Sequence, residues 1–157
     1  MPVNFSSEVC ISAKPESVFA AMTNFEQWRH WMQGLVSIQQ LTPGDFGVGT
    51  KWKETRMMYG RQASELFEVT LCVPDKSLGL AVDGSKGTTG RGEFRFEYKL
   101  VPANGGTRLQ MTGSVAMPGF LSSLMCRMMI GTFKKACDRD LAAMKAFLEE
   151  ARTQSAG

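Results

Sequence analysis

The sequence predicts an α+β fold, in which a curved antiparallel sheet of seven strands wraps around one long C-terminal helix, with two short helices between strands 1 and 2. Apolar residues recur every three or four positions from Phe120 to Arg152, which is typical of one amphipathic helix roughly 45–50 Å long. Between residues 36 and 117, segments of alternating polarity are separated by short turns, which indicates a meander of strands. Seven strands span about 30 Å and a helix only about 10–12 Å, so the sheet must curl around the helix.

The N-terminal segment begins with a strand. Residues Val3 to Ile11 alternate apolar and polar side chains, the pattern of a strand with one buried face. Proline suits the first position of a helix because its missing N–H would have no partner there. We therefore expect a short helix that starts at Pro15, with Val18, Phe19 and Met22 on its buried side.

A second short helix is expected directly after the first. Thr23 and Glu26 have the spacing of a capping box, in which Thr23 is the N-cap and Glu26 reaches back to it. This helix would carry Trp28 and Trp31 and would end by Gly34.

The middle of the chain predicts the other six strands. They are expected at residues 36–41, 50–58, 64–73, 78–82, 93–100 and 107–117. Tyr59-Gly60-Arg61 and Asn104-Gly105-Gly106 are typical of hairpin turns, and Pro74 ends the strand before it. Because short turns join successive strands, neighbouring strands should pair antiparallel.

Composition and length describe an ordinary globular protein. The 157 residues are 43% hydrophobic and 21% charged, so we expect a single domain over residues 1–157. The net charge of +3 is spread along the chain without a basic block, which argues against a nucleic-acid partner. The sequence does not determine the oligomeric state.

The cysteine and histidine content argues against a metal site. Cys10, Cys72, Cys126 and Cys137 show no CxxC spacing, and His30 is the only histidine. The start of the chain lacks the features of a signal peptide, and no stretch reaches the ~18 apolar residues of a transmembrane helix. We therefore expect a cytoplasmic protein with free thiols and no transmembrane segment.

A sheet that curls around one helix tends to leave an apolar space, and small-molecule sites often occupy such spaces. The walls of this space would be Phe67, Val69, Leu71, Phe94, Phe96, Tyr98 and Met111, facing Leu124, Met125 and Met128. The alternative, which the sequence favours equally, is that these side chains fill the space as a core. Gly131 weakens the long helix by about 1 kcal/mol relative to Ala, and predicts a bend or a close approach of the sheet or a ligand.

Five segments carry a resemblance to a known superfamily. They are Ile11–Phe19, Trp28–Met32, Val48–Trp52, Glu65–Leu80 and the long C-terminal helix. In order and pattern they resemble the START-like (SRPBCC, polyketide cyclase/dehydrase-like) superfamily over nearly the whole chain. The resemblance implies a helix-grip fold with a hydrophobic cavity, and members that bind lipids, sterols, polyketides or aromatic compounds, some of them enzymes. The cysteine and histidine pattern of Rieske-type oxygenase subunits is absent, so no iron site and no cofactor is expected.

Polar residues on one strand are the candidates for a ligand anchor. If Trp52 points inward, the two-residue period of a strand places Glu54 and Arg56 on the same inner face, and we favour this phase slightly. The alternative is a solvated pair of little energetic weight. The expected ligand-binding residues are Trp31, Trp52, Glu54, Arg56, Phe67, Phe94, Phe96, Tyr98, Met111, Leu124, Met125 and Met128. Weak catalytic candidates are Glu54, Tyr98 and His30, although a surface role is favoured for His30 because no partner is visible for it.

The favoured function is binding, and conceivably transport, of a small hydrophobic molecule such as a lipid, polyketide or aromatic compound in the cavity. The first alternative is a cyclase- or dehydratase-type enzyme that uses the same cavity. The second alternative is a protein-interaction module with a filled core, which an exposed apolar patch on Phe120 to Met129 would favour. The sequence does not decide whether the protein is an enzyme.

Overall fold

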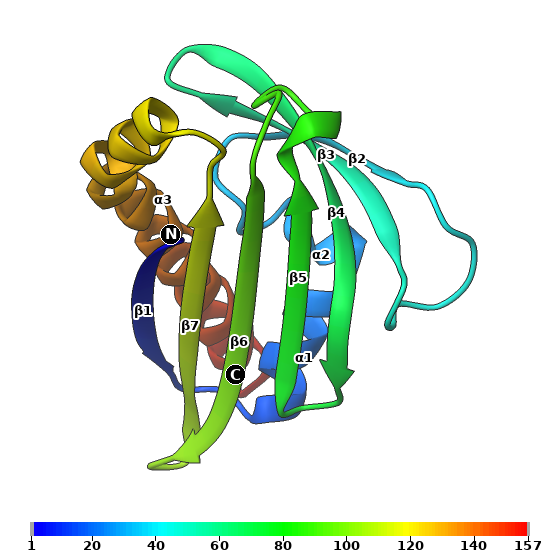
Figure 1. Cartoon of the computed structure of the whole chain (residues 1–157). Coiled ribbons are helices and arrows are strands. Elements are labelled where there is room, and N and C mark those ends of the chain that lie inside the picture. Colours follow the sequence, from blue (N-terminus) through cyan, green and yellow to red (C-terminus); the bar gives the residue numbers. More distant parts are fainter. Residues whose placement is uncertain (1, 157) are drawn as a thin grey trace.

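The computed structural model describes residues 2–156, with side chains to residue 154, and its architecture is the expected α+β arrangement (Figure 1). The strands are β1 Val3–Ile11, β2 Leu35–Gln40, β3 Lys51–Met58, β4 Arg61–Val73, β5 Ser77–Asp83, β6 Glu93–Ala103 and β7 Gly106–Ala116. The helices are α1 Pro15–Thr23, α2 Phe25–Trp28 and α3 Phe120–Ala156, and η1 Gly84–Lys86 is a single 3₁₀ turn. The seven-stranded antiparallel sheet curves around α3, which confirms the predicted fold class.

The sheet is a meander closed by its first strand. Its order is β1-β7-β6-β5-β4-β3-β2, so β1 pairs with β7 at the far end of the chain. Several strands are longer than expected, because pairing continues to the hairpin turns at Met58↔Arg61 and Ala103↔Gly106. Tyr59 and Asn104, each followed by glycine, have φ values of 53° and 49° in these turns, a conformation that two-residue hairpins require.

A bulge in β4 changes which side chains point inward. The register with β5 shifts between Val69 and Leu71, so Val69 is buried while Leu71 is 39% exposed. The expectation that Leu71 belongs to the inner wall is therefore wrong. An extra residue in one strand reverses the alternation beyond it.

The N-cap of α2 is not the residue that the sequence predicted. Asn24, not Thr23, is the N-cap of α2, and its side chain accepts a hydrogen bond from the Glu26 N–H at 3.0 Å. Thr23 instead donates to the Phe19 carbonyl within α1. Because α2 ends at Trp28, Trp31 lies in the turn that follows it.

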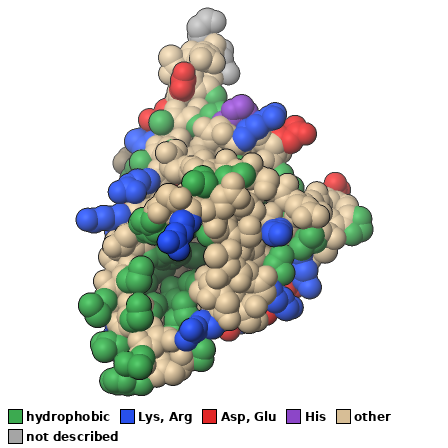
Figure 2. All heavy atoms as spheres, turned by 90° about the horizontal axis from the view of Figure 1, so that it is seen from above, with side chains coloured by type: hydrophobic (Ala, Val, Ile, Leu, Met, Phe, Trp, Pro, Cys, Tyr) green, Lys and Arg blue, Asp and Glu red, His purple; other side chains and the backbone are tan. Residues whose placement is uncertain are grey.

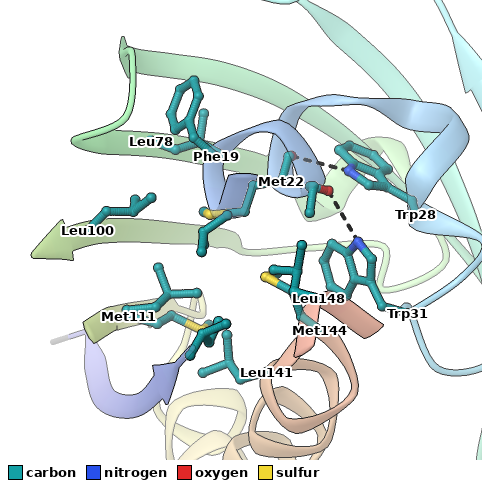
Figure 3. Packing of buried hydrophobic residues seen from close by; sticks show 14 of the residues in the cluster. Phe19, Met22, Trp28, Trp31, Leu78, Leu100, Met111, Leu141, Met144 and Leu148 are labelled. Atoms are coloured by element: carbon teal, nitrogen blue, oxygen red, sulfur yellow. Dashed lines mark hydrogen bonds between the residues drawn. The ribbon is translucent and has the colours of Figure 1, made fainter. Parts of the chain in front are cut away.

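The core lies between the sheet, α1 and the C-terminal half of α3 (Figure 3). It includes Phe19 and Met22 of α1, Leu78, Leu100 and Met111 of the sheet, and Leu141, Met144 and Leu148 of α3. Two indole N–H groups are satisfied here, since Trp28 donates to the Met22 carbonyl and Trp31 donates to the Ala21 carbonyl. Satisfied indoles fix the position of α1 against the turn after α2.

Burial changes along α3. Leu141, Met144 and Leu148 are buried, whereas the inward-facing Phe133 and Cys137, one to two turns earlier, are only partly buried. The first three turns carry a large apolar surface that nothing covers: Phe120, Leu121, Leu124, Met125, Met128 and Met129 are all exposed. Only the second half of the helix therefore packs as a core helix.

Gly131 does not mark a close approach of the sheet. No atom lies within 4 Å of the position that a Cβ would occupy there. Among the helices described between residues 2 and 156, none is long and apolar enough to span a membrane.

Candidate functional site

Strand β3 carries charged side chains on the inner face of the sheet. Trp52 and Glu54 are buried and Arg56 is partly buried, while Lys51, Lys53 and Met57 at the alternate positions are exposed. This is the strand phase that the sequence favoured. Thr55 also occupies an alternate position but is buried, and its hydroxyl hydrogen-bonds to Ser64. Glu54 is 6% exposed, which is rare for a carboxylate unless a partner compensates its charge.

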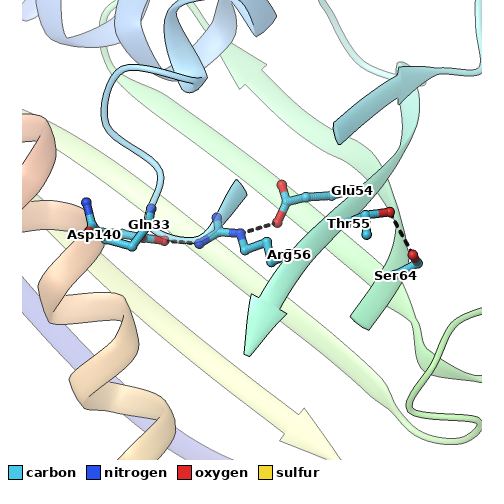
Figure 4. A network of polar contacts seen from close by, with 6 residues as sticks. All are labelled: Gln33, Glu54, Thr55, Arg56, Ser64 and Asp140. Carbon is cyan, nitrogen blue, oxygen red and sulfur yellow. Dashed lines mark hydrogen bonds and ion pairs between the residues drawn. The ribbon is translucent and has the colours of Figure 1, made fainter. Parts of the chain in front are cut away.

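Arg56 joins β3 to α3 (Figure 4). Its Nε donates to Glu54 Oε2 at 2.8 Å, and its Nη1 donates to Asp140 Oδ2 of α3 at 2.6 Å. The other carboxylate oxygen of Asp140 accepts a hydrogen bond from the Gln33 backbone N–H at 3.0 Å. Glu54, Arg56 and Asp140, hereafter the polar cluster, therefore tie together the sheet, the helix and the loop after α2.

The electrostatics of the polar cluster favour a charged guanidinium. Burial alone would lower the pKa of Arg56, but the charges of Glu54 and Asp140, together with the hydrogen bonds to both, raise that pKa above its ordinary value. Two carboxylates and one guanidinium leave a formal charge of −1. The polar cluster therefore has no spare positive charge for an anionic ligand.

Tyr98 and Cys137 lie beside the polar cluster. Burial raises the pKa of the Tyr98 phenol, and Cys137, Asp140, Arg56 and Glu54 are close enough to affect that pKa as well. Burial likewise raises the pKa of the Cys137 thiol to about 12. Both groups are therefore neutral at physiological pH.

Two oxygens of this region have no hydrogen-bond partner within residues 2–154. The Tyr98 hydroxyl makes none, and Glu54 bonds to Arg56 only through Oε2, which leaves Oε1 free. A hydroxyl that both donates and accepts, next to a carboxylate oxygen that accepts, can bind a hydroxyl, a phenol or a carbonyl group.

Aromatic side chains surround the space nearer the start of α3. Phe133 of α3 packs edge-on against Phe5, with ring centres 5.4 Å apart, and lies at 6.3 Å from Phe94 and 6.2 Å from Phe96. All four rings are only partly buried. They form an apolar wall from two strands, β1 and β6, and one helix, α3, and this wall is only partly covered.

A second aromatic group packs around two buried tryptophans, Trp28 and Trp52. Trp52 is 1% exposed and stacks on Phe67 with ring centres 5.3 Å apart. Trp28 lies 5.1 Å from Trp52, and Phe25 and Phe46 complete the group. Among the expected ligand-binding residues, Trp31 and Met111 are likewise buried in the core. Trp52 precedes Glu54 by two residues on the inner face of β3, so this group holds the strand that carries the polar cluster.

The side chains expected to face the inner wall from α3 are largely exposed. Leu124 is 46%, Met125 61% and Met128 79% exposed, so they do not fill this part of the space as a core. Figure 2 shows hydrophobic side chains gathered around a hollow at this end of the molecule. The apolar space is therefore open beside the first half of α3 and filled beside the second half.

His30 lies apart from the polar cluster. Its exposed imidazole stacks on Phe147 near the end of α3, with ring centres 5.5 Å apart. No hydrogen bond joins it to Glu54, Tyr98 or Arg56 in the described part of the chain.

Four residues of the site were not among the expected ones: Phe5, Phe133, Cys137 and Asp140. The sequence analysis assigned no role to Asp140, whose partner Arg56 lies 84 residues away. Phe5 lies at an apolar position of the alternating segment Val3–Ile11, but its position beside Phe133 depends on the pairing of β1 with β7. The spacing of Phe133, Cys137 and Asp140, at four and three residues, is the one local signal that places them on a common helix face.

A shallow depression on the other face of the sheet is a separate feature. It has a volume of about 580 Å³ and is lined largely by outward side chains such as Asn4, Thr70, Arg95, Glu97 and Thr112. Within residues 2–154, no group of three or more His, Cys, Asp or Glu side chains is arranged to hold a metal ion. The candidate site is therefore the polar cluster and the adjoining apolar space.

Solved structures of similar fold cover almost the whole chain. Ara h 8.0201 superposes with a TM-score of 0.75 at 17% identity, covering 96% of this chain and 99% of that chain. TTHA0849 from Thermus thermophilus gives a TM-score of 0.76 at 14% identity, covering 95% and 99% respectively. Mll3558 from Rhizobium loti gives 0.70 at 20% identity, covering 93% and 96%. At these identities the likeness establishes the fold alone.

Comparison at the sequence level identifies the family. No curated protein matches the chain. The family model described as "Polyketide cyclase / dehydrase and lipid transport" matches residues 2–149, nearly the whole length. Together with the helix-grip architecture, this match shows that the chain belongs to the polyketide cyclase / dehydrase and lipid transport family of the START-like (SRPBCC) superfamily.

Proposed function

We propose that this protein binds a small, largely apolar molecule between the sheet and the first half of α3, with the polar end of that molecule at Tyr98 and Glu54. The observation that carries the proposal is the pair of unpartnered oxygens, the Tyr98 hydroxyl and Glu54 Oε1, at the inner end of an open apolar space. Both oxygens remain accessible to solvent, so a ligand that hydrogen-bonds to them would take the place of water there. Family membership supports the proposal. We expect the protein to bind its ligand in the cytoplasm and to have no nucleic-acid partner.

The apolar wall favours a ligand that contains rings or a flat hydrocarbon frame. Phe94, Phe96 and Phe133 present partly buried rings, against which an aromatic ligand can stack or pack edge-on. Leu124, Met125 and Met128 would cover the outer part of the ligand, since thioethers adapt to irregular shapes.

The polar cluster favours a neutral ligand over a carboxylate. Arg56 already bonds to both Glu54 and Asp140, so a ligand carboxylate would meet a formal charge of −1. A phenol or alcohol can instead donate to Glu54 Oε1 and accept from the Tyr98 hydroxyl. The proposed ligand class is therefore a hydroxylated aromatic or polycyclic compound.

Displacement of a neutral fluorescent probe, N-phenyl-1-naphthylamine, tests this proposal. We expect 2-naphthol and 2-methylnaphthalene to displace the probe. Replacement of Tyr98 by Phe should lower the affinity for 2-naphthol about fivefold, which corresponds to the loss of one hydrogen bond. The affinity for 2-methylnaphthalene, which has no hydroxyl group, should not change. Replacement of Phe96 by Ala should lower the affinity for both compounds about tenfold, because both lose apolar contact with the ring.

Leu71→Ala is the matched control, because Leu71 lies on the opposite face of the same sheet. It should change neither affinity. If Phe96→Ala behaves like Leu71→Ala, the binding space lies elsewhere and the proposal is wrong.

The alternative of a cyclase or dehydratase uses the same groups. Glu54 Oε1 could accept a proton from a bound substrate, and the Tyr98 hydroxyl could bind its carbonyl oxygen. Glu54→Gln separates the two functions, because an enzyme would lose turnover while it retains binding. A carrier would show only a change in affinity.

A further inference from the structure

The first three turns of α3 present an apolar surface that the fold leaves uncovered. We call this surface the α3 patch, and it consists of Phe120, Leu121, Leu124, Met125, Met128 and Met129. Phe120 is 81% exposed and Met128 is 79% exposed. Six large apolar side chains on one short stretch of helix exceed the scattered exposure usual for a protein surface.

The segments around the α3 patch carry only positive charge. The β3–β4 turn (57–62), the loop between β5 and β6 (84–92) and the start of α3 (117–137) together contain six basic residues and no acidic one. The whole chain has a charge of +3, so the remainder has 3 − 6 = −3. These segments are therefore basic, and the acidic residues Asp83, Glu93 and Asp138 lie directly at their borders.

These segments lie at one end of the molecule. Figure 1 places the β3–β4 turn, the β5–β6 loop and the β7–α3 connection together at the top, and Figure 2 looks down on this end. Arg91 of the β5–β6 loop donates to Ser122 Oγ of α3 at 2.9 Å, and Thr88 Oγ1 accepts from the Ser64 N–H next to the β3–β4 turn. The hollow seen in Figure 2 opens at the same end.

Most of these basic side chains form no ion pair within the described part of the protein, so they can pair with an external anion. Lys86 and Lys134 pair with Asp83 and Asp138. Within residues 2–154 the other four have no acidic partner in ion-pair distance: Arg61, Arg91, Arg127 and Lys135. The acidic residues that flank this end, Asp83 and Glu93, are paired with Lys86 and Arg95, and Glu65 accepts from Thr89.

We propose that this end of the protein docks on the surface of an anionic lipid bilayer, with the α3 patch in the headgroup–acyl boundary. An apolar helix face flanked by arginine and lysine is the physical pattern of an interfacial helix. Each basic residue near an anionic membrane contributes about a fivefold gain in affinity. Docking here would turn the opening of the hollow toward the membrane, although the inference does not depend on a ligand in that space.

A second copy of the chain fits this surface less well. A two-fold contact brings identical surfaces together, so the four unpaired basic side chains of one copy would face the same four of the other. Like charges held together in this way oppose association. Charge complementarity therefore favours the anionic bilayer as the occupant.

Vesicle co-sedimentation of the full chain tests the inference. We expect binding to vesicles of phosphatidylcholine mixed with phosphatidylglycerol, release by added salt, and little binding to phosphatidylcholine alone. Replacement of both Arg127 and Lys135 by Gln should weaken binding about 25-fold. Replacement of both Met125 and Met128 by Ser should weaken it about tenfold or more.

Lys99→Gln is the control, because Lys99 is exposed toward the other end of β6. Circular dichroism of each variant checks that the fold is intact, and probe binding by the Arg127 and Lys135 variant checks that the ligand site is intact. Equal binding to neutral and anionic vesicles, or equal binding by the charge variant and Lys99→Gln, would overturn the inference. A dimer in light scattering together with no vesicle binding would also overturn it and would assign the α3 patch to a second copy.

Discussion

Arg56 is held between two carboxylates on the inner face of the sheet, so three charges depend on one another. Glu54 is buried at 6% exposure, and Asp140 also bonds to the Gln33 backbone N–H. A buried ion pair is weak evidence for stability, but loss of one partner leaves an uncompensated charge. Arg56 therefore offsets the free-energy cost of burying the Glu54 carboxylate on the inner face.

Replacement of Arg56 by Met should destabilise the protein by about 3 kcal/mol, because Glu54 and Asp140 would face each other without compensation. Urea denaturation followed by circular dichroism measures this loss. Arg95→Met is the matched control, since Arg95 pairs with Glu93 at the surface and should cost less than about 1 kcal/mol. Equal losses for the two variants would show that the polar cluster is solvated.

The raised pKa of Cys137 predicts a decline of stability at alkaline pH. The unfolded thiol ionises near pH 9.0, whereas burial raises the folded pKa to about 12. Between these values the folded state keeps a proton that the unfolded state has lost, so the free energy of unfolding falls as pH rises. The burial of Tyr98 acts in the same direction.

Cys137→Ala should reduce this slope by at most about 1.4 kcal/mol per pH unit between pH 9 and 12, as measured by urea denaturation at several pH values. Cys10 is exposed, so Cys10→Ala should leave the slope unchanged. An unchanged slope in Cys137→Ala would mean that the thiol is accessible to water.

At the scale of elements, the two halves of α3 lie in different environments, one exposed and one buried. Its second half is buried against α1 and the sheet, and its first half has only Phe133 and its neighbours in contact with the wall. Gly131 lies between the two halves, in open space. The stability of the first half therefore depends on helix propensity more than on packing.

Gly131→Ala should stabilise the protein by up to about 1 kcal/mol, because alanine restricts the unfolded chain and meets no atom in the folded one. Thermal unfolding measures the gain. Gly113→Ala should do the opposite, since a Cβ there would overlap the Phe5 ring. Destabilisation by Gly131→Ala would indicate that the helix needs a flexible point between its halves.

The sequence predicted elements better than contacts. Periodicity located all seven strands and the long helix, because a buried face imposes a two- or 3.6-residue repeat. It failed at Leu71, where a bulge reverses the alternation, and at Thr23, where the neighbouring Asn24 takes the cap. Both failures are local choices that the pattern cannot distinguish.

The candidate site was predictable only on the side of the sheet. The inward phase of Glu54 and Arg56 follows from their spacing to Trp52. The contact with Asp140 joins residues 84 positions apart, which no local pattern contains. The exposure of Met125 and Met128 was expected only under the alternative of a protein-interaction module, because periodicity identifies an apolar face but not what covers it.

At the scale of the whole molecule, the apolar space is filled at one end and open at the other. The filled end provides the core, and the polar cluster lies between it and the aromatic wall of Phe5, Phe94, Phe96 and Phe133. The open end carries the α3 patch and the excess positive charge. This polarity is consistent with a ligand that enters beside the first half of α3 and stops at Tyr98.

Native mass spectrometry of the protein purified from its own host, with solvent extraction of any bound compound, tests the central claim most directly. We predict a co-purifying neutral apolar molecule with a hydroxyl group. It should be lost when Tyr98 is replaced by Trp and retained when Leu71, on the outer face, is replaced by Trp. An unoccupied protein that also takes up none of a panel of fatty acids, sterols and polyphenols would contradict the claim.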